Sequence, residues 1–352
     1  MKSSTASTIT LVFAGDTSLG EKYLEKRFSK ALKRVQNKPH TFYEKLAPLI
    51  GDKDHLIANL ETVLTDDPLA PIHPDKLYCY ADSIARSIEF MKDIKVDAVS
   101  LGNNHAMDRG EAGLRSTMSA LTTAGIDFYG AGANRRAAER PLRLGDVHVV
   151  GGYQTRKQFQ QFGIYANKDR PGVNQFGLRN PNRMSRTIER VRRRHPNAFI
   201  IATPHWSLNY GAPGAGPRRA FESMIEAGAD LVLGHGTHNL QTWLRQCGRT
   251  SVFSLGNFVF NSPGRYAALK ASPFSAIARL TLRPCAGKWE DILKLYPIVS
   301  DNRLTRFRPR PVDEAEARQV FAFLASQEPD LFESSHILDK DERGWFISTL
   351  GH

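Results

Sequence analysis

Cysteine is scarce in this sequence. Among its 352 residues there are three cysteines, Cys79, Cys247 and Cys285, which lie far apart and form no CxxC pair. An odd and dispersed set of this kind excludes a disulfide framework and a thiolate zinc site. It is also typical of a reducing compartment, so we expect a cytoplasmic protein.

Long apolar runs are absent as well. No segment approaches the roughly 18 apolar residues that a membrane-spanning helix needs, and the polar start Met1–Thr8 lacks the apolar stretch of a signal peptide. Hydrophobic residues make up 41% of the chain, charged residues make up 24%, and the mean hydropathy is −0.38. This ordinary composition excludes disordered, collagen-like and coiled-coil classes, so we predict a soluble globular protein with no membrane span.

Several common catalytic signatures are missing. The sequence has no GxxxxGK[ST] phosphate-binding loop, no GxSxG nucleophile elbow and no HExxH helix. The GxG at Gly130–Gly132 lacks the third glycine of a dinucleotide-binding fingerprint, so we interpret it as a turn.

What the chain does have is positive charge. With 48 Lys and Arg against 36 Asp and Glu, its formal net charge is +12, which favours an anionic partner. The basic residues are spread along the chain, and the densest run, Arg190–Arg194, is interpreted as a solvated helix face. We therefore predict an anionic small-molecule or polymer substrate and do not favour nucleic acid.

Short apolar segments alternate with amphipathic ones, which predicts an α/β layered fold with parallel strands. The expected strands are Thr8–Ala14, Leu56–Leu60, Val96–Leu101, Val147–Gly151, Phe199–Thr203, Leu231–Leu233 and Val252–Leu255. Helix signals lie between them, for example Leu114, Met118 and Leu121 before the stop at Gly125, and a capping box of Thr41 with Glu44. We expect one domain over 1–352, with functional motifs in about 9–310 and a C-terminal helical extension over 311–352.

Polar side chains with metal-binding atoms follow five of these strands. They are Asp16, Glu61, Asn104 with His105, His205, and His235 with His238. Because ligands of open α/β sheets bind beyond the carboxyl ends of the strands, this set has the composition of a metal site.

Each of these residues has a structural alternative. Asp16 after a glycine could be a turn residue, and His205 could be a hydrogen-bonded core histidine. Asp108, with Glu111 three residues later, could form a capping box for the next helix, a role that is compatible with a catalytic one. The argument therefore depends on the whole set at matching strand ends.

The motifs GDTSLG (Gly15–Gly20), NLE (Asn59–Glu61), NNHAMDRG (Asn103–Gly110), PHW (Pro204–Trp206), GHGTHNLQ (Gly234–Gln241) and SLGNFVF (Ser254–Phe260) occur in this order. Together they resemble the CapA family, the poly-γ-glutamate capsule-synthesis branch of the calcineurin-like metallophosphoesterases. The resemblance implies a four-layered α/β/β/α sandwich that holds two divalent metal ions, either Mn, Fe or Zn.

The resemblance also implies residue roles. Asp16 and His238 would bind the first metal, Glu61 would bridge the two, and Asn104, His205 and His235 would complete the second site. His105 would be the catalytic acid or substrate-orienting residue, with Asp108 beside it. Asn59, Ser207, Asn209 and Tyr210 are expected to contact the substrate. Ser207 and Asn209 stand where the family commonly has Gly and Glu in HWGxEY.

Three functions are compatible with these residues. The main expectation is a metal-dependent hydrolase of a phosphoester. The alternative is a component of poly-γ-glutamate-like polymer or peptide biosynthesis that acts on γ-glutamyl amide or acyl-phosphate groups. The third is a binding protein that has lost its metals, for which salt-sensitive nucleic-acid binding would be the sign.

Overall fold

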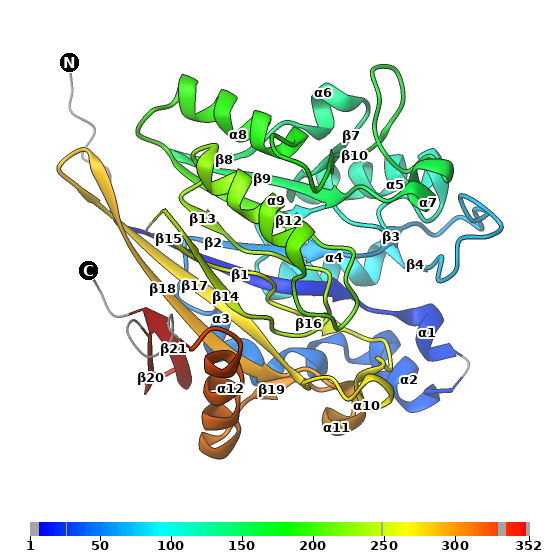
Figure 1. Cartoon of the computed structure of the whole chain (residues 1–352). Coiled ribbons are helices and arrows are strands. Elements are labelled where there is room, and N and C mark those ends of the chain that lie inside the picture. Colours follow the sequence, from blue (N-terminus) through cyan, green and yellow to red (C-terminus); the bar gives the residue numbers. More distant parts are fainter. Residues whose placement is uncertain (1–6, 26, 248, 330–335, 350–352) are drawn as a thin grey trace.

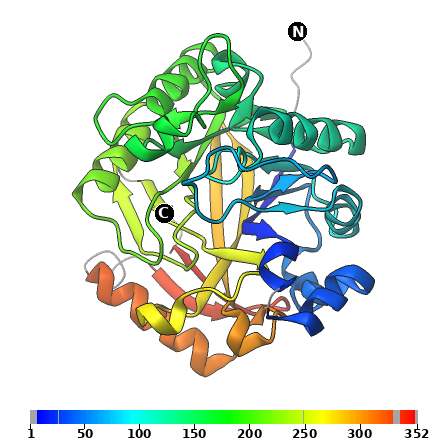
Figure 2. The ribbon, with the colours of Figure 1, turned by 90° about the vertical axis from the view of Figure 1, so that its right-hand side faces the viewer.

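Two β-sheets pack face to face at the centre of the protein (Figure 1). A computed structural model describes residues 7–25, 27–247, 249–329 and 336–349. Seen from the side in Figure 2, the strands occupy the middle and the helices surround them.

The first sheet has ten strands within the described residues, ordered β20-β21-β18-β17-β1-β2-β5-β6, with β16 paired to β1 and β19 to β18. Its strands are β1 (Ile9–Ser18), β2 (His55–Leu60), β5 (Ala98–Ser100), β6 (Asp127–Tyr129), β16 (Asn257–Phe260), β17 (Phe274–Cys285), β18 (Lys288–Val299), β19 (Arg310–Pro311), β20 (His336–Lys340) and β21 (Trp345–Thr349). Strands β1, β2, β5 and β6 run parallel, whereas β17 is antiparallel to β1.

The second sheet has five described strands, ordered β11-β9-β12-β13 with β8 paired to β9. They are β8 (Leu142–Leu144), β9 (Val147–Gln154), β11 (Gln175–Phe176), β12 (Phe199–His205) and β13 (Leu231–Val232). Three small pairs complete the described strands: β3 (Val63–Leu64) with β4 (Ala81–Asp82), β7 (Ala131–Gly132) with β10 (Gly172–Val173), and β14 (Trp243–Gln246) with β15 (Arg249–Val252).

Alternation along the strands explains the layers. In β1, Leu11 and Phe13 point into the core between the two sheets, while Val12 and Ala14 point into the core under the helices. In β12, Ile201 likewise faces the inter-sheet core, and Ile200 faces the helices on the other side. Each sheet is therefore covered on both faces, which is why its strands are continuously apolar.

Most of the helices form the two outer layers. Those described are α1 (Glu21–Glu25), α2 (Ser29–Asn37), α3 (Ala47–Ile50), α4 (Ile84–Asp93), α5 (Gly110–Ala124), α6 (Arg135–Ala138), α7 (Lys157–Gln161), α8 (Arg183–Arg194), α9 (Ala215–Glu226), α10 (Tyr266–Leu269), α11 (Asn302–Thr305) and α12 (Glu314–Gln327). Helices α2 to α5 pack on the first sheet, and α8 and α9 pack on the second. The predicted α/β/β/α arrangement is confirmed, and among these helices none is long and apolar enough to cross a bilayer.

Some local predictions are wrong. Instead of a helix capped by Thr41, the chain forms two 3₁₀ turns, Pro39–Phe42 and Glu44–Leu46, because Pro39 begins a separate turn and Thr41 bonds the carbonyl of Lys38. The expected strand at Val252–Leu255 is shifted, with β15 ending at Val252 and β16 beginning at Asn257. The segment 311–352 contains α12, as expected, but also β20 and β21, which extend the first sheet.

Candidate metal centre

The register of the first sheet brings three polar residues together. Asp16 in β1 lies opposite Asn59 in β2 and Asn257 in β16. The Nδ2 of Asn59 donates to Asp16 Oδ1 at 2.8 Å. The adjacent Gly15 is needed for this approach, because a Cβ there would lie 1.9 Å from the carbonyl oxygen of Gly256.

The second sheet supplies histidines from the facing side. His205 ends β12 and pairs with His235 through a parallel bridge. The Nδ1 atoms of His235 and His238 lie 3.8 and 3.4 Å from the carboxylate of Asp16, and His205 Nε2 lies 3.7 Å from Glu61 Oε1. Four of the six expected metal ligands thus surround Asp16, and the ligand atoms of Asp16, Glu61 and His238 lie within 4.8 Å of one another.

The turn that carries His235 and His238 has a constrained backbone. Gly236 has a φ of 94°, and a Cβ there would lie 2.3 Å from the carbonyl oxygen of Trp206. His238 is itself left-handed, with a φ of 64°, which is uncommon for a residue with a side chain. Its carbonyl accepts a 2.6 Å hydrogen bond from Tyr266, and its Nδ1 lies 3.0 Å from Asn257 Oδ1. The bond from Tyr266 holds the backbone of His238, and the contact with Asn257 orients its ring.

His105 belongs to a second polar cluster at the same edge. Its Nδ1 lies 2.7 Å from Asp108 Oδ2, and its Nε2 lies 3.8 Å from Glu61 Oε1. The other oxygen of Asp108 accepts a 2.5 Å hydrogen bond from the buried Lys76 ammonium. Asp108 therefore does not cap α5, whose first residue follows Arg109 without a side-chain cap. The capping-box prediction is wrong because Lys76 and His105 take both carboxylate oxygens.

The two buried carboxyl groups differ in protonation behaviour. Burial alone would raise the pKa of Asp16, but His238, followed by His205 and His235, outweighs it and brings the pKa to about 2. Burial raises the pKa of Glu61 well above its usual value, and the nearby charges of Asp16 and Asp108 add to that effect. Glu61 is thus the group that most needs a neighbouring positive charge.

Three histidines of the cluster, His105, His205 and His235, favour the neutral form. Burial lowers the pKa of His205 to about 3, although Asp16 opposes the shift, and burial likewise lowers the pKa of His235. For His105 burial again dominates over Asp108, so its pKa is lowered. Neutral imidazole is the form that coordinates metal ions.

Several buried atoms of this cluster have no hydrogen-bond partner within the described part of the chain. They are Asp16 Oδ2, both carboxylate oxygens of Glu61, and His235 Nδ1. Buried polar atoms are normally paired, and leaving one unpaired costs on the order of 1–3 kcal/mol, or more for a charged group. Carboxylate oxygens and imidazole nitrogens that converge without partners fit a divalent cation.

A cavity of about 460 Å³ opens beside the cluster. Its lining includes the predicted residues Asn104, His105, His238, Ser207, Asn209 and Tyr210. Asn59 does not line it: its side chain is buried between Asp16 and His205, so the expected substrate contact is replaced by a positioning role. Three cationic side chains, Lys76, Arg156 and Arg265, also line the cavity.

Residues beside the cluster were missed by the sequence reasoning. Asn257 occurs within the motif SLGNFVF, and its position after an apolar strand was an available signal. Asn103 donates to Asn59 at 3.2 Å and was visible next to the expected ligand Asn104. Lys76 lies in a loop with no flanking pattern, so nothing in the sequence indicated its burial.

An α/β/β/α sandwich with carboxylates and histidines gathered at its strand ends defines a protein of the metallophosphoesterase-like superfamily. Within that class, the family described as "Bacterial capsule synthesis protein PGA_cap" matches residues 10–262. The chain belongs to this family.

Curated relatives carry related names. The chain is 26% identical over 260 residues, or 71% of its length, to the PGA biosynthesis protein CapA of Bacillus subtilis (strain 168), covering 62% of that protein. It is 26% identical to the capsule biosynthesis protein CapA of Bacillus anthracis, over 72% of this chain and 60% of that one. A probable polyglutamine synthesis accessory protein of Mycobacterium tuberculosis is 29% identical over 60% of this chain and 57% of its own length. The chain thus spans about three fifths of the length of these relatives.

Proposed function

We propose that this protein takes part in the biosynthesis of a poly-γ-glutamate-like anionic polymer, acting through a divalent metal centre on γ-glutamyl amide or acyl-phosphate groups. The observation that carries the proposal is the pair of carboxylates Asp16 and Glu61, buried among histidines beside a cavity lined by cations. Three of their four oxygens have no hydrogen-bond partner among the described residues. The names of the family and of its relatives supply the polymer.

The metal-binding roles are those that the family resemblance implies. Asp16 and His238 would hold one ion, Asn104, His205 and His235 the other, and Glu61 would lie between them. Such ions supply Lewis-acid polarisation of a substrate oxygen. Two divalent ions would also offset the negative charge that raises the pKa of Glu61.

The chain's own residues then handle substrate and proton. Arg156 and Arg265 favour a substrate that carries carboxylates, whereas the charge of Lys76 is offset by Asp108. Asp108 accepts the Nδ1 hydrogen of His105 and holds the ring with Nε2 available to the cavity. In hydrolysis of a γ-glutamyl amide, this Nε2 would take a proton from the attacking water as the carbon–oxygen bond forms. It would then pass that proton to the leaving nitrogen as the carbon–nitrogen bond breaks.

Hydrolysis of a phosphoester is the second candidate, because the superfamily is named for that reaction and the same His105 could protonate a leaving oxygen. The two candidates differ only in the bond that is cleaved. They share the metal requirement, so a substrate comparison decides between them.

The first test is metal content, measured by elemental mass spectrometry on protein purified without chelator. We expect one to two equivalents of Mn, Fe or Zn, lost in the His235→Ala/His238→Ala variant and retained in His40→Ala, which removes an exposed histidine elsewhere. Failure to bind Mn²⁺ or Zn²⁺ on titration would instead support a protein that has lost its metals.

The second test compares γ-glutamyl peptides with generic phosphoesters, following amine or phosphate release. Amine release that drops by about 10²–10⁴-fold in His105→Ala, with metal retained, supports the proposal. Phosphate release with inert peptides would transfer the assignment to the phosphoester candidate.

A further inference from the structure

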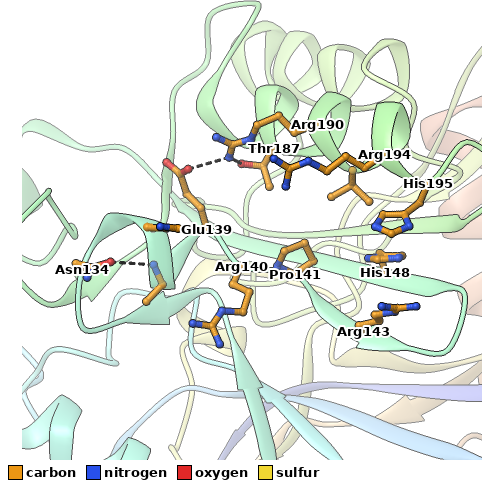
Figure 3. A pocket seen from close by; sticks show the side chains of 13 residues that line it. Asn134, Glu139, Arg140, Pro141, Arg143, His148, Thr187, Arg190, Arg194 and His195 are labelled. Atoms are coloured by element: carbon orange, nitrogen blue, oxygen red, sulfur yellow. Dashed lines mark hydrogen bonds and ion pairs between the residues drawn. The ribbon is translucent and has the colours of Figure 1, made fainter.

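A second, larger pocket lies on the outside of the other sheet. Its volume is about 840 Å³, and it is formed by α6, β8, the beginning of β9 and the end of α8 (Figure 3). β9 connects it to the metal-centre cavity: His148 near the start of that strand lines this pocket, and Tyr153 near its end lines the other. Five residues of extended strand separate the two by roughly 16 Å.

Arginine dominates the lining of this pocket, which we call the arginine groove. Its arginines are Arg136, Arg140, Arg143, Arg190 and Arg194. The one carboxylate in the lining belongs to Glu139, which accepts a 2.8 Å hydrogen bond from Arg190 and lies 3.9 Å from Arg183. Within the described ranges, the other four arginines form no ion pair with a carboxylate. The groove therefore carries a large uncompensated positive charge.

The basic run at the end of α8 divides between two roles. Arg192 is used inside the fold: it binds Asp230 at 2.6 Å and the carbonyls of Ala198 and Gly228. Arg190 and Arg194 are one helical turn apart and both face the groove (Figure 3). The expected solvated face is present, since Arg190, Arg193 and Arg194 are exposed, and two of these arginines also line the pocket.

Two histidines with their rings in contact form one side of the groove. The rings of His148 and His195 lie 4.7 Å apart at 30°. Burial lowers the pKa of His148, and His195 and Arg143 lower it further, while Asp146 on the adjacent turn opposes them. The positive charge of the groove thus acts on a group at its wall.

We propose that the arginine groove binds a segment of an acidic polymer through the carboxylates of successive residues. Arginine, and no lysine, lines it, and the planar guanidinium pairs with carboxylates in two-point contacts. The lining contains no Phe, Tyr or Trp on which bases could stack, which is the usual platform of single-stranded nucleic-acid sites. The choice of a polycarboxylate over other anions rests on the proposed function. The assignment of the groove as an anion-binding site does not depend on that function.

The test measures binding of fluorescein-labelled poly-γ-glutamate to the full chain by anisotropy. In Arg140→Glu/Arg194→Glu we expect affinity to fall by about tenfold or more, since two charge-assisted contacts are reversed. The matched control, Arg193→Glu/Arg303→Glu, makes the same change in net charge at exposed arginines outside the groove, and we expect less than about a twofold loss. Arg140→Lys/Arg194→Lys keeps the charge without the fork and should lose an intermediate amount.

Equal losses in the two charge-reversed variants would overturn the proposal, because net charge alone would then explain the binding. A labelled oligonucleotide that binds more tightly than the polymer would also overturn it in favour of a nucleic-acid site, and full competition by equimolar inorganic phosphate would reduce it to a phosphate site. Circular dichroism of each variant checks folding.

Repeating the titration in His235→Ala/His238→Ala separates the two proposals. We expect polymer binding to be retained there, since neither histidine lines the groove. Polymer binding that is retained without metal or activity would support the arginine groove as a binding site even if the proposed function were wrong.

Discussion

The two ends of β9 lie beside sites of opposite charge, buried carboxylates at one end and exposed arginines at the other. Near its carboxyl end, Asp16 and Glu61 are buried in a cluster of histidines. Three of their oxygens, and Nδ1 of His235, have no hydrogen-bond partner in the described part of the chain. At its amino end, exposed arginines surround a groove, and four of the five have no carboxylate partner among the described residues, whereas Arg190 pairs with Glu139. The first arrangement suits small cations held rigidly, and the second suits a flexible anion held by many exchangeable contacts. The two proposals thus assign chemistry to the buried site and attachment to the exposed one.

Removing one ligand should give the largest effect. We expect Asp16→Asn to weaken binding of Mn²⁺ or Zn²⁺ by about a thousandfold, because metal sites distribute on the order of 10–16 kcal/mol over about four ligands. Isothermal titration calorimetry measures the metal affinity. The control is Asp146→Asn, which removes a carboxylate near the arginine groove and should leave this affinity unchanged. An unchanged affinity in Asp16→Asn would break the contrast between the two ends of the strand.

The buried ion pair next to His105 should show the next largest effect. Lys76→Met leaves Asp108 charged and buried, which we expect to lower the free energy of unfolding by about 3–5 kcal/mol. In Lys76→Met/Asp108→Leu the isolated charge is gone, so a large part of that loss should be recovered. Urea unfolding of the two variants tests this, and a loss under about 1 kcal/mol in the single variant would contradict a buried pair.

Glu61 should make the metal-free protein sensitive to alkaline rather than acidic pH. Its folded pKa is raised above 4.5, so the folded state keeps a proton that the unfolded state releases, and its contribution to stability declines as the pH rises through this window. Glu61→Gln has no such proton. With chelator present, we expect the variant's advantage in urea unfolding to be small near pH 4 and to grow toward pH 8. A constant difference would show that folding does not change the pKa of Glu61.

The groove should show the smallest effect on stability. Arg194→Gln removes a side chain without an ion-pair partner among the described residues, and we expect a change within about 0.5 kcal/mol. The guanidinium of Arg192 donates four hydrogen bonds that anchor the loops at Ala198, Gly228 and Asp230. We therefore expect Arg192→Gln to lower the free energy of unfolding by about 1 kcal/mol or more. Thermal unfolding compares them, and a reversed order would show that Arg194 supports the fold.

The sequence predicted the layers well because apolar periodicity and glycine stops are local signals. Helix α5 ends where Gly125 adopts a left-handed conformation, as the pattern indicated. The predicted Thr41 cap is absent because Pro39 starts its own turn. The sequence contains both signals and does not show which of the two determines the local structure. The strands β20 and β21 were missed since their pairing with β18 is a long-range contact.

The candidate site was predictable to the extent that strand ends converge. Asp16, Glu61, His205, His235 and His238 come together because parallel strands end at one edge. The role of Asp108 was not predictable, because its partner Lys76 is 32 residues away along the chain in an irregular loop. Asn59 was misplaced for a similar reason: its register with Asp16, rather than its position near the strand end, decides where the side chain points.

The pairing of β1 with β17 has a consequence for how the chain is made. Residues Ile9–Phe13 bond to Ala278–Leu282, which lie beyond the region matched by the family, residues 10–262. At synthesis rates of about 5–20 residues per second, the first strand would wait on the order of tens of seconds for its neighbour to leave the ribosome. During that interval an apolar strand edge stays open, so the nascent chain has a period of vulnerability to aggregation that the finished protein does not show.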